Sequence, residues 1–508
     1  MSTVKSDLVT RSDSHLFPDP SRVLAQLFVP GLELVLDRES RATGVLARLL
    51  ALPEETVITT LAALSERFTK RHRDFNSILW ENYNRVMHRV SSDTILTLER
   101  QLLIGATFTK EFSVESAALF NPSVVPHPDQ SGLEVGSVRF VLSLRAVGEG
   151  HISSVEFRTG VVGPDNNLQL DNHGEFLEAG HYGPAIHERQ LFQDKLAEAG
   201  NDKESSSFLM RQFPAHFDND MLETALSELV DQSDTRRGGV RFKELARRIA
   251  ACNYEVDFDE TSLLSERILW PHSPSESHGI EDARFVQFIN DDGSKVYYAT
   301  YTAFDGEQVA PNLIETVDFQ HFKIGQLSGP AAKNKGMAIF PRKINGRFFA
   351  LSRWDRENNA IATSADGRVW GTPTTLHVPE QPWELIQLGN SGSPIETEAG
   401  WLVITHGVGP MREYALGALL LDIDDPNKII GSLDEPLMRP EEGERDGYVP
   451  NVLYSCGAMA FGDQLLLPYG ISDSSIGFAF VDVPKLLERL TGAQAHPRSN
   501  ETALDLNL

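Results

Sequence analysis

Two adjacent carboxylates and an arginine form the segment of this sequence whose residue types best suit chemistry. The segment reads His-Gly-Ile-Glu-Asp-Ala-Arg over residues 278–284 and directly precedes a strand-like run. Glu281 and Asp282 can hold or transfer a proton, and Arg284 can stabilise negative charge. At the entrance of a strand, the backbone fixes the direction of such side chains toward a concave surface. The same residue types also form ordinary ion pairs on exposed turns, so the rest of the chain has to decide between the two interpretations.

Composition excludes some classes of function. The chain has 508 residues and a formal net charge of -26, with 41% hydrophobic and 23% charged residues. This length predicts two domains, or one large repetitive domain with appendages. The negative charge argues against a nucleic-acid partner, which would need clustered lysine and arginine. Cys252 and Cys456 are too few and too far apart for a zinc site or a disulfide scaffold, so no metal is expected.

Hydropathy predicts a cytoplasmic protein without a membrane partner. No apolar run reaches the roughly 18 residues that a membrane-spanning helix needs. Residues 1–16 carry charges and hydroxyl groups where a signal peptide would have an apolar core.

The first part of the chain, residues 1–110, is predicted to be helical. Pro53 followed by Glu54 and Glu55 suits the first turn of a helix. Apolar residues then recur at helical spacing, at Leu50, Val57, Leu61, Leu64 and Phe68.

After about residue 115, short strands separated by glycine turns become the dominant pattern. The strands are expected at 138–144, 296–301, 348–352, 401–405 and 464–467. Four of them follow a polar turn, and the turn glycines at 293, 346, 400 and 462 are 53, 54 and 62 residues apart. A period near 50 residues with several strands per unit is typical of a β-propeller blade.

A further hairpin near Ser131-Gly132 brings the number of units to five. The gap before the next unit is too long for one blade and contains apolar residues at helical spacing between 221 and 230. We therefore predict an all-β five-bladed β-propeller over 111–485, with a partly helical insertion at about 160–265. The helical region 1–110 precedes it, and a tail, 486–508, follows.

Most of these units also carry a polar motif, and a propeller would bring such motifs together near its axis. They include Phe120-Asn121-Pro122, Gly279 to Arg284, Phe340-Pro341-x-Lys343-Ile344-x-Gly346, Gly400-Trp401-Leu402 with His406-Gly407, Leu421-Asp422 with Asp425-Pro426, Asn451-Val452 with Cys456-Gly457, and Tyr469-Gly470 with Asp473. On these segments the sequence resembles glycoside hydrolase family 130, whose members process β-linked mannosides on a five-bladed β-propeller. The resemblance covers about residues 116–485 without the insertion, and the helical N-terminal region lies outside it.

The resemblance implies roles for individual residues. Asp282 matches the general acid of the family, in which the proton is thought to pass through a hydroxyl of the bound mannose. Burial beside Glu281 would raise the pKa of Asp282 and Arg284 would lower it, so the two effects oppose each other. The residues expected to bind substrate are Asn121, Arg145, Glu281, Arg284, His406, Tyr469 and Asp473.

The attacking nucleophile depends on three further positions. Lys335 and Arg353 resemble phosphate ligands of the phosphorylases in the family, whereas Glu396 replaces a third residue that is usually basic. A carboxylate there would repel phosphate and could activate water opposite Asp282, as in inverting hydrolases whose carboxyl groups lie about 6.5 to 9.5 Å apart. The hydrolases of the family carry glutamate at both variable positions, and this chain keeps Arg353, so neither pattern is complete.

Three functions remain open from the sequence. The favoured one is an inverting glycosidase that cleaves β-mannosides with water, Asp282 acting as acid and Glu396 as base. The alternative is a β-mannoside phosphorylase that uses inorganic phosphate and yields α-mannose 1-phosphate. A glycan-binding propeller without catalysis is the third, since Glu396 and Ala283 depart from the family pattern. An oligosaccharide is the expected partner, no cofactor other than phosphate as co-substrate is expected, and a homo-oligomer is possible.

Overall fold

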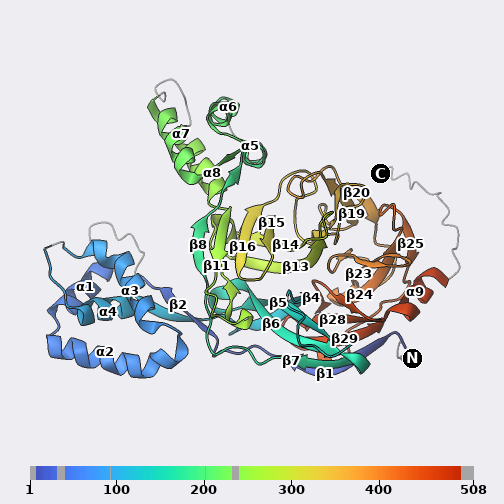
Figure 1. The fold of residues 1–508 in the computed structure, drawn as a ribbon, viewed down its shortest axis with the longest axis horizontal. Coiled ribbons are helices and arrows are strands. Elements are labelled where there is room, and N and C mark those ends of the chain that lie inside the picture. Colours follow the sequence, from blue (N-terminus) through green and yellow to red (C-terminus); the bar gives the residue numbers. More distant parts are fainter. Residues whose placement is uncertain (1–6, 31–40, 92, 201, 232–238, 493–508) are drawn as a thin grey trace.

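A computed structural model of the chain describes residues 7–30, 41–91, 93–200, 202–231 and 239–492. Within these residues the protein is mostly β, and two groups of helices project from the β body at separate places (Figure 1). These two groups of helices lie in the N-terminal region and in the insertion, where the sequence predicted helical additions, so the term all-β fits only the β body.

Antiparallel hairpins build the β body. Its larger sheets have 11, 4, 5 and 5 strands within the described residues. The 11-stranded sheet combines two consecutive groups, because β6 pairs with β13 in parallel at one point. The first group consists of β4 (Ala118–Pro126), β5 (Val138–Val147), β6 (Ser153–Gly163), β7 (Asn167–Leu170) and β12 (Ile268–Leu269), and the second of β13 (Gly279–Ile289), β14 (Lys295–Phe304), β15 (Val309–Thr316) and β16 (His321–Gln326).

The remaining three sheets follow in chain order. The third group consists of β17 (Ala338–Ile339), β18 (Phe348–Ser352), β19 (Asn359–Ser364) and β20 (Thr374–His377). The fourth consists of β21 (Gln387–Asn390), β22 (Ile395–Thr397), β23 (Gly400–Val408), β24 (Tyr414–Leu421) and β25 (Ile429–Ser432). The last consists of β26 (Leu453–Tyr454), β27 (Met459–Phe461), β28 (Gln464–Ile471) and β29 (Ser475–Asp482). All five strands expected from the glycine turns are present, as parts of β5, β14, β18, β23 and β28.

The last sheet also includes a strand from the beginning of the chain. β1 (Val9–Leu16) pairs antiparallel with β29, from Val9 opposite Val481 to Leu16 opposite Ile476. Region 1–110 is therefore not wholly helical, since β1 belongs to the β body. At the other end of the chain, α9 (Val483–Gly492) packs its apolar face on the same core, and residues 493–508 of the expected tail lie outside the described residues.

The N-terminal helices form a lobe of their own. They are α1 (Arg41–Ala51), α2 (Glu54–Phe68), α3 (Phe75–Val86) and α4 (Leu98–Thr107). Asp74 and Thr97 cap α3 and α4, each accepting a backbone N–H of the first turn. The ribbon of β2 (Val23–Leu27) and β3 (Thr109–Ser113) leads into and out of the lobe.

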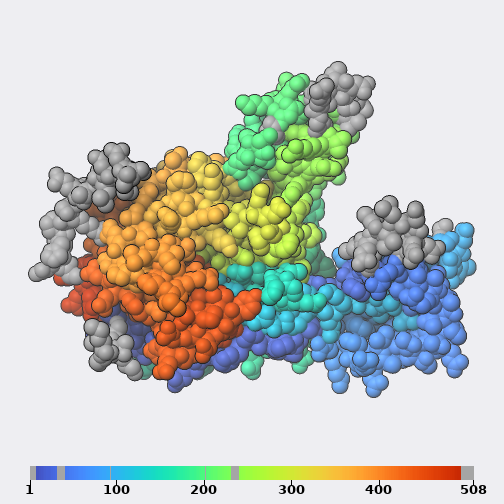
Figure 2. Space-filling model, turned by 180° about the vertical axis from the view of Figure 1, so that it is seen from behind, coloured from blue at the N-terminus to red at the C-terminus, as the bar shows by residue number. Residues whose placement is uncertain are grey.

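The insertion expected at about 160–265 is partly helical. Its helices are α5 (Arg189–Glu198), α6 (Lys203–Gln212), α7 (Asn219–Asp231) and α8 (Gly239–Ala250), and they share a separate apolar cluster. Its strands β8 (His181–Pro184) and β11 (Tyr254–Asp257) extend the sheet beyond β16, while β9 (His187–Glu188) pairs with β10 (His216–Phe217). Seen from behind, this helical lobe and the N-terminal lobe stand apart (Figure 2).

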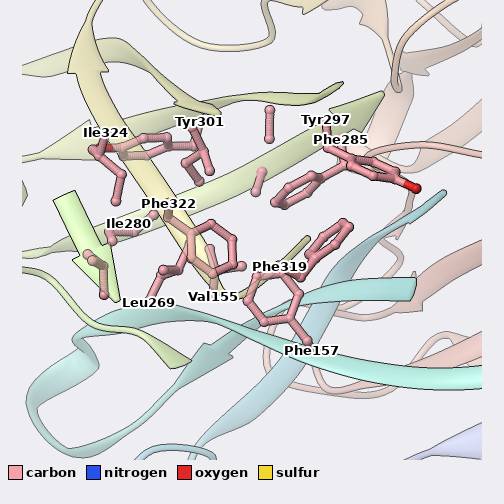
Figure 3. Close-up of a cluster of buried hydrophobic side chains, with 14 of the residues drawn as sticks. Val155, Phe157, Leu269, Ile280, Phe285, Tyr297, Tyr301, Phe319, Phe322 and Ile324 are labelled. Atoms are coloured by element: carbon pink, nitrogen blue, oxygen red, sulfur yellow. The ribbon is translucent and has the colours of Figure 1, made fainter. Parts of the chain in front are cut away.

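An aromatic cluster holds β13 against its neighbours. Phe157 of β6 contacts Phe285 of β13 and Phe319, just before β16, edge to face, and stacks on Phe322 of β16 (Figure 3). Each fully buried aromatic side chain contributes on the order of 1.5 to 3 kcal/mol. The cluster therefore fixes the strand that carries Glu281 and Asp282.

Candidate active site

The same kind of backbone irregularity, in β4 and in β13, places Asn121 and Asp282 side by side. Asn121 in β4 and Asp282 in β13 each lie in an irregularity of the strand register and have positive φ angles of 49° and 55°. Such a bulge redirects a side chain out of the regular alternation of a strand. As a result, Asn121 Nδ2 donates a hydrogen bond of 2.7 Å to Asp282 Oδ1.

The start of β13 requires a glycine. Gly279 has a φ of 132°, and a Cβ atom there would come within 2.4 Å of Ser153 Oγ. Only glycine combines this conformation with so close an approach to β6. Gly279 thus lets β13 approach β6 closely, just before the two carboxylates of the 278–284 segment.

Cations surround both carboxylates. Arg145, on β5, donates from NH1 to Asp282 Oδ1 at 3.1 Å and from NH2 to Glu281 Oε1 at 2.7 Å. The ammonium group of Lys335 pairs with the other oxygen of Glu281. Glu281 thereby positions Arg145 and Lys335 beside Asp282.

Arg284 contacts the backbone of Asp282. Its guanidinium group donates to the backbone carbonyl of Asp282 at 2.9 Å and to the hydroxyl of Tyr454 at 2.7 Å. Burial alone would raise the pKa of Asp282, but Arg145, Arg284 and Lys335 hold that pKa well below its usual range. Of the two opposing effects expected from the sequence, the lowering one prevails, and Asp282 is ionised at neutral pH with only the protein's own charges around it.

These groups face a cavity of about 310 Å³. Seven of the residues expected in the site line it: Asn121, Arg145, Asp282, Lys335, Arg353, His406 and Asp473. Its size and its mixture of charged and aromatic walls suit a small polar ligand such as a sugar.

Arg353 and His406 form a pair on the cavity wall. Arg353 NH1 lies 3.0 Å from Nε2 of His406. Burial and the charges of Arg353 and Arg284 keep the pKa of His406 well below its usual range, so the imidazole is neutral and accepts this hydrogen bond. The partner of Arg353 at the cavity wall is therefore a neutral group and not a carboxylate.

Asp473 reaches the cavity from the turn between β28 and β29. It follows Ser472, and the two residues have φ angles of 50° and 48°. Burial and the charge of Asp282 raise the pKa of Asp473 to about 6, against the lowering effects of Arg145 and Arg412. The cavity therefore contains two carboxyl groups of very different acidity.

Glu396 is not where the sequence placed it. It is absent from the cavity lining among the described residues, and 44% of its side chain is exposed to solvent. Arg342 holds its carboxylate with two hydrogen bonds, of 2.8 Å from Nε and 2.7 Å from NH2. The expected general base for water is thus a surface ion pair in this structure, because β22 directs the side chain toward Arg342.

Tyr469 also lies away from the cavity. Its ring is buried in the core of the last sheet, and its hydroxyl donates to Glu444 Oε1 at 2.7 Å. Contrary to the expectation of a sugar contact, Tyr469 is a packing residue here. Glu281 and Arg284 differ again, since they contact the residues that line the cavity without lining it themselves.

Several lining residues were not assigned to the site from the sequence: Phe120, Val147, His151, Gln387, Arg412, Tyr414, Tyr448, Val452 and Tyr454. His151 and Arg412 reach the cavity from turns with positive φ angles of 60° and 57°, which the residue types did not reveal. Tyr454 lies between the matching pairs Asn451-Val452 and Cys456-Gly457, so the resemblance itself was a signal for it.

The described residues contain neither a cluster of metal ligands nor a membrane-spanning helix. No group of three or more histidine, cysteine or acidic side chains there is arranged to hold a metal ion. None of the described helices has the length and apolar character needed to cross a membrane.

Comparisons with known proteins identify the family of the chain. Residues 253–491 match the sequence model of glycoside hydrolase family 130, described as beta-1,4-mannooligosaccharide phosphorylase. A beta-1,2-mannobiose phosphorylase from Listeria innocua is 33% identical over 230 residues, which are 44% of this chain and 63% of that protein. A 1,2-beta-oligomannan phosphorylase from Thermoanaerobacter sp. is 34% identical over 254 residues, or 46% of this chain and 79% of that protein.

A solved structure of the beta-1,2-mannobiose phosphorylase from Listeria innocua, in complex with beta-1,2-mannobiose, is also similar. It aligns with a TM-score of 0.44 and 22% identity over 75% of this chain and 93% of that one. The alignment to the first relative leaves more than a third of that protein uncovered, whereas the second is matched over most of its length. On the match to the second relative and to the family's sequence model, the chain belongs to glycoside hydrolase family 130.

Proposed function

We propose that this protein is a β-mannoside phosphorylase, which breaks a β-mannosidic bond with inorganic phosphate and yields α-mannose 1-phosphate. The observation that carries the proposal is the charge around the cavity. Lys335 and Arg353 line it together with Asp282, while Glu396 lies outside it in a pair with Arg342. The two cations at such a site can neutralise a phosphate dianion. Glu396, which the sequence favoured as the base for water, is not part of the described lining.

The cations suit phosphate for two reasons. Arg353 donates to a neutral histidine, and within the described parts of the chain it forms no ion pair with a carboxylate. Lys335 pairs with Glu281 but keeps 37% of its side chain exposed, so it can turn toward a ligand in the cavity. Cations of this kind can stabilise the negative charge of the phosphate as it attacks the sugar.

Asp282 is the proposed proton donor to the leaving glycosidic oxygen. A phosphate dianion near Lys335 and Arg353 would offset the positive charges that lower the pKa of Asp282, and so raise it. Binding of the nucleophile would thereby prepare the acid. Phosphate attacks C1 from the face opposite the leaving oxygen, which inverts the β-linkage and gives the α-phosphate.

We further propose that the five groups of strands are the blades of a five-bladed β-propeller. Support comes from the spacing of the turn glycines and from the residues that meet at one cavity. Asn121 and Arg145 belong to the first group and Asp282 to the second. Arg353 lies between β18 and β19 of the third group, and His406 belongs to the fourth. Such convergence from separate strand groups is expected near the axis of a propeller.

The names of the relatives support phosphorolysis over hydrolysis, since both sequence relatives described above are phosphorylases. They also suggest β-1,2-linked mannosides as first substrates, whereas the family's sequence model is described by a β-1,4 activity. An oligosaccharide and phosphate are thus the proposed substrates, with no further cofactor.

One assay tests the proposal. The protein is incubated with β-1,2-mannobiose or β-1,4-mannobiose, with and without phosphate, and α-mannose 1-phosphate is followed by ³¹P NMR. We expect mannose release to require phosphate. Release of mannose alone, at the same rate without phosphate, would show hydrolysis, and no turnover of any mannoside would favour the glycan-binding alternative.

Arg353 provides the matched variant. Arg353→Met should raise the KM for phosphate by about tenfold or more, because one charge-assisted contact contributes roughly 1.5 to 3 kcal/mol. Arg342→Met makes the same substitution outside the cavity and should leave that KM within about twofold, as expected for an exposed pair. Equal effects of the two variants would remove Arg353 from the phosphate site.

A further inference from the structure

Two carboxyl groups line the cavity, and their surroundings differ sharply. Asp282 accepts hydrogen bonds from Asn121 at 2.7 Å and from Arg145 at 3.1 Å. Asp473 has no hydrogen-bond or ion-pair partner among residues 7–30, 41–91, 93–200, 202–231 and 239–492. When two carboxyl groups share one site, the group with more hydrogen bonds and nearby cations stays ionised and the other takes up the proton.

We propose that Asp473 holds the proton that the reaction needs and that Asp282 passes it on to the leaving oxygen. This inference rests on the proposed phosphorolysis, because it names the source of that reaction's proton. It gives Asp473 a role beyond contact with the sugar.

The charges that face Asp473 support this assignment. Burial and the nearby charge of Asp282 favour the neutral form of Asp473, and Arg145 and Arg412 oppose them. Arg145 directs both ends of its guanidinium group at other carboxylates, Asp282 and Glu281. The resulting pKa of about 6 lies close to neutral pH, where a carboxyl group can both hold and release a proton.

The turn that carries Asp473 is held in place. The backbone N–H of Ser472 donates to the carbonyl of Val452 at 2.7 Å, and its hydroxyl donates to the carbonyl of Glu444 at 2.7 Å. The carbonyl of Ser472 in turn accepts the N–H of Val449 at 2.9 Å. A rigid turn keeps the Asp473 carboxyl group at the cavity, as a group that exchanges a proton with a bound ligand requires.

The proposed step balances. The O–H bond of Asp473 breaks, and its proton passes to Asp282 through a hydroxyl group of the bound sugar, since the two carboxyl groups share no hydrogen bond in the described part of the chain. The proton ends on the glycosidic oxygen as the bond between C1 and that oxygen breaks. An oxygen of hydrogen phosphate bonds to C1, and the proton released from the phosphate restores Asp473. The products are the free alcohol of the leaving sugar and the dianion of α-mannose 1-phosphate.

The test uses the Asp473→Asn variant and two leaving groups. Asparagine tolerates the positive φ angle of this position, so the turn should be retained. Without the proton, kcat for β-1,2-mannobiose at saturating phosphate should fall by about 10² to 10⁴-fold. With 4-nitrophenyl β-mannoside, whose leaving group needs no proton, kcat should fall by less than about tenfold.

The pH profile gives a second readout. In the wild-type enzyme, the ratio of kcat/KM for mannobiose to that for the nitrophenyl mannoside should fall as pH rises past about 6, because Asp473 then loses its proton. Titration of phosphate itself cancels in this ratio. In Asp473→Asn the ratio should be low and independent of pH over this range.

Asp165→Asn is the matched control, since Asp165 has a φ of 58° in an exposed turn outside the cavity. It should behave as wild type. An equal loss on both substrates, or a raised KM with the pH dependence of the ratio unchanged, would overturn the proposal and leave Asp473 as a sugar contact. If Asp473→Asn proves unfolded by circular dichroism, Asp473→Gly, which also accepts this conformation, takes its place. Absence of phosphate-dependent turnover in the wild type would instead refute the proposed function.

Discussion

The charged cluster at the cavity resembles a second cluster at the junction where the chain enters β2. Of the two, only the cluster at the cavity is open to a ligand. At the junction, Arg22 and Arg158 contact Glu115 and Glu156, and all four side chains are buried. At the cavity, Arg145 and Lys335 contact Glu281, and Arg145 also contacts Asp282. Both clusters therefore pair two carboxylates with two cations.

In both places, one carboxyl group has a raised pKa and another has a lowered pKa. Burial and the charge of Glu156 raise the pKa of Glu115 to about 8, while the two arginines lower the pKa of Glu156 against the effect of burial. At the cavity, Asp473 and Asp282 differ in the same sense. Shifted pKa values and ion pairs thus occur in a buried cluster as well as at an open site. Only a cluster that a ligand can reach through a cavity can take part in a reaction, and the buried one can contribute to stability alone.

The largest expected effect breaks the open cluster. Asp282→Asn should lower kcat for β-mannobiose by about 10² to 10⁴-fold, since the group that passes the proton to the leaving oxygen is lost. Stability should change little, because asparagine tolerates the φ of 55° and keeps an oxygen for Asn121. Steady-state kinetics and thermal melting measure both. A kcat near that of wild type would exclude Asp282 from the reaction.

Breaking the closed cluster should have the opposite result. Arg22→Met removes hydrogen bonds of 2.9 and 2.6 Å to Glu156 and leaves that carboxylate buried beside Glu115. The loss should be about 3 to 5 kcal/mol of unfolding free energy. Urea unfolding gives this value, and kcat per folded molecule should stay unchanged. A fall in kcat without loss of stability would link the two clusters.

A third experiment sharpens the comparison through pH. The folded pKa of Glu115 lies above the ordinary value, so its contribution to stability is complete below about pH 4.5 and is lost as pH rises to about 8. Glu115→Gln should abolish this loss, and its Tm should decline less than that of wild type between pH 5 and pH 8. Parallel Tm curves for the two proteins would mean that Glu115 is ionised throughout.

The smallest effect is expected at Glu396. Glu396→Gln weakens an exposed pair with Arg342, which contributes about 0 to 1 kcal/mol. Turnover of β-mannobiose with phosphate should remain within about twofold of wild type. A large loss of turnover would restore Glu396 to the reaction and favour the hydrolytic mechanism.

Local patterns predicted much of the β body. Glycine turns located β14, β18, β23 and β28 because a tight hairpin needs residues that accept positive φ, and this requirement is visible in the residue types. The 278–284 segment was found from its two carboxylates and its arginine at the start of a strand, and the structure adds that Gly279 is needed where β13 meets β6.

Side-chain direction was the part that local patterns could not predict. Glu396 contacts Arg342, which is 54 residues away in sequence, and no feature of β22 alone reveals that partner. Asp473 was found by resemblance, but its contrast with Asp282 depends on charges from Arg145 on β5 and Arg412 in the turn before β24. His151 was missed because its left-handed turn has no distinctive sequence.

The pairing of β1 with β29 sets an order for folding during synthesis. These strands lie at opposite ends of the described chain, and β1 completes the sheet that β28 and β29 form. A ribosome makes β1 first, and β1 cannot pair until β29 has left the exit tunnel. Until that pair forms, β1 and the free edge of β29 can pair with other chains.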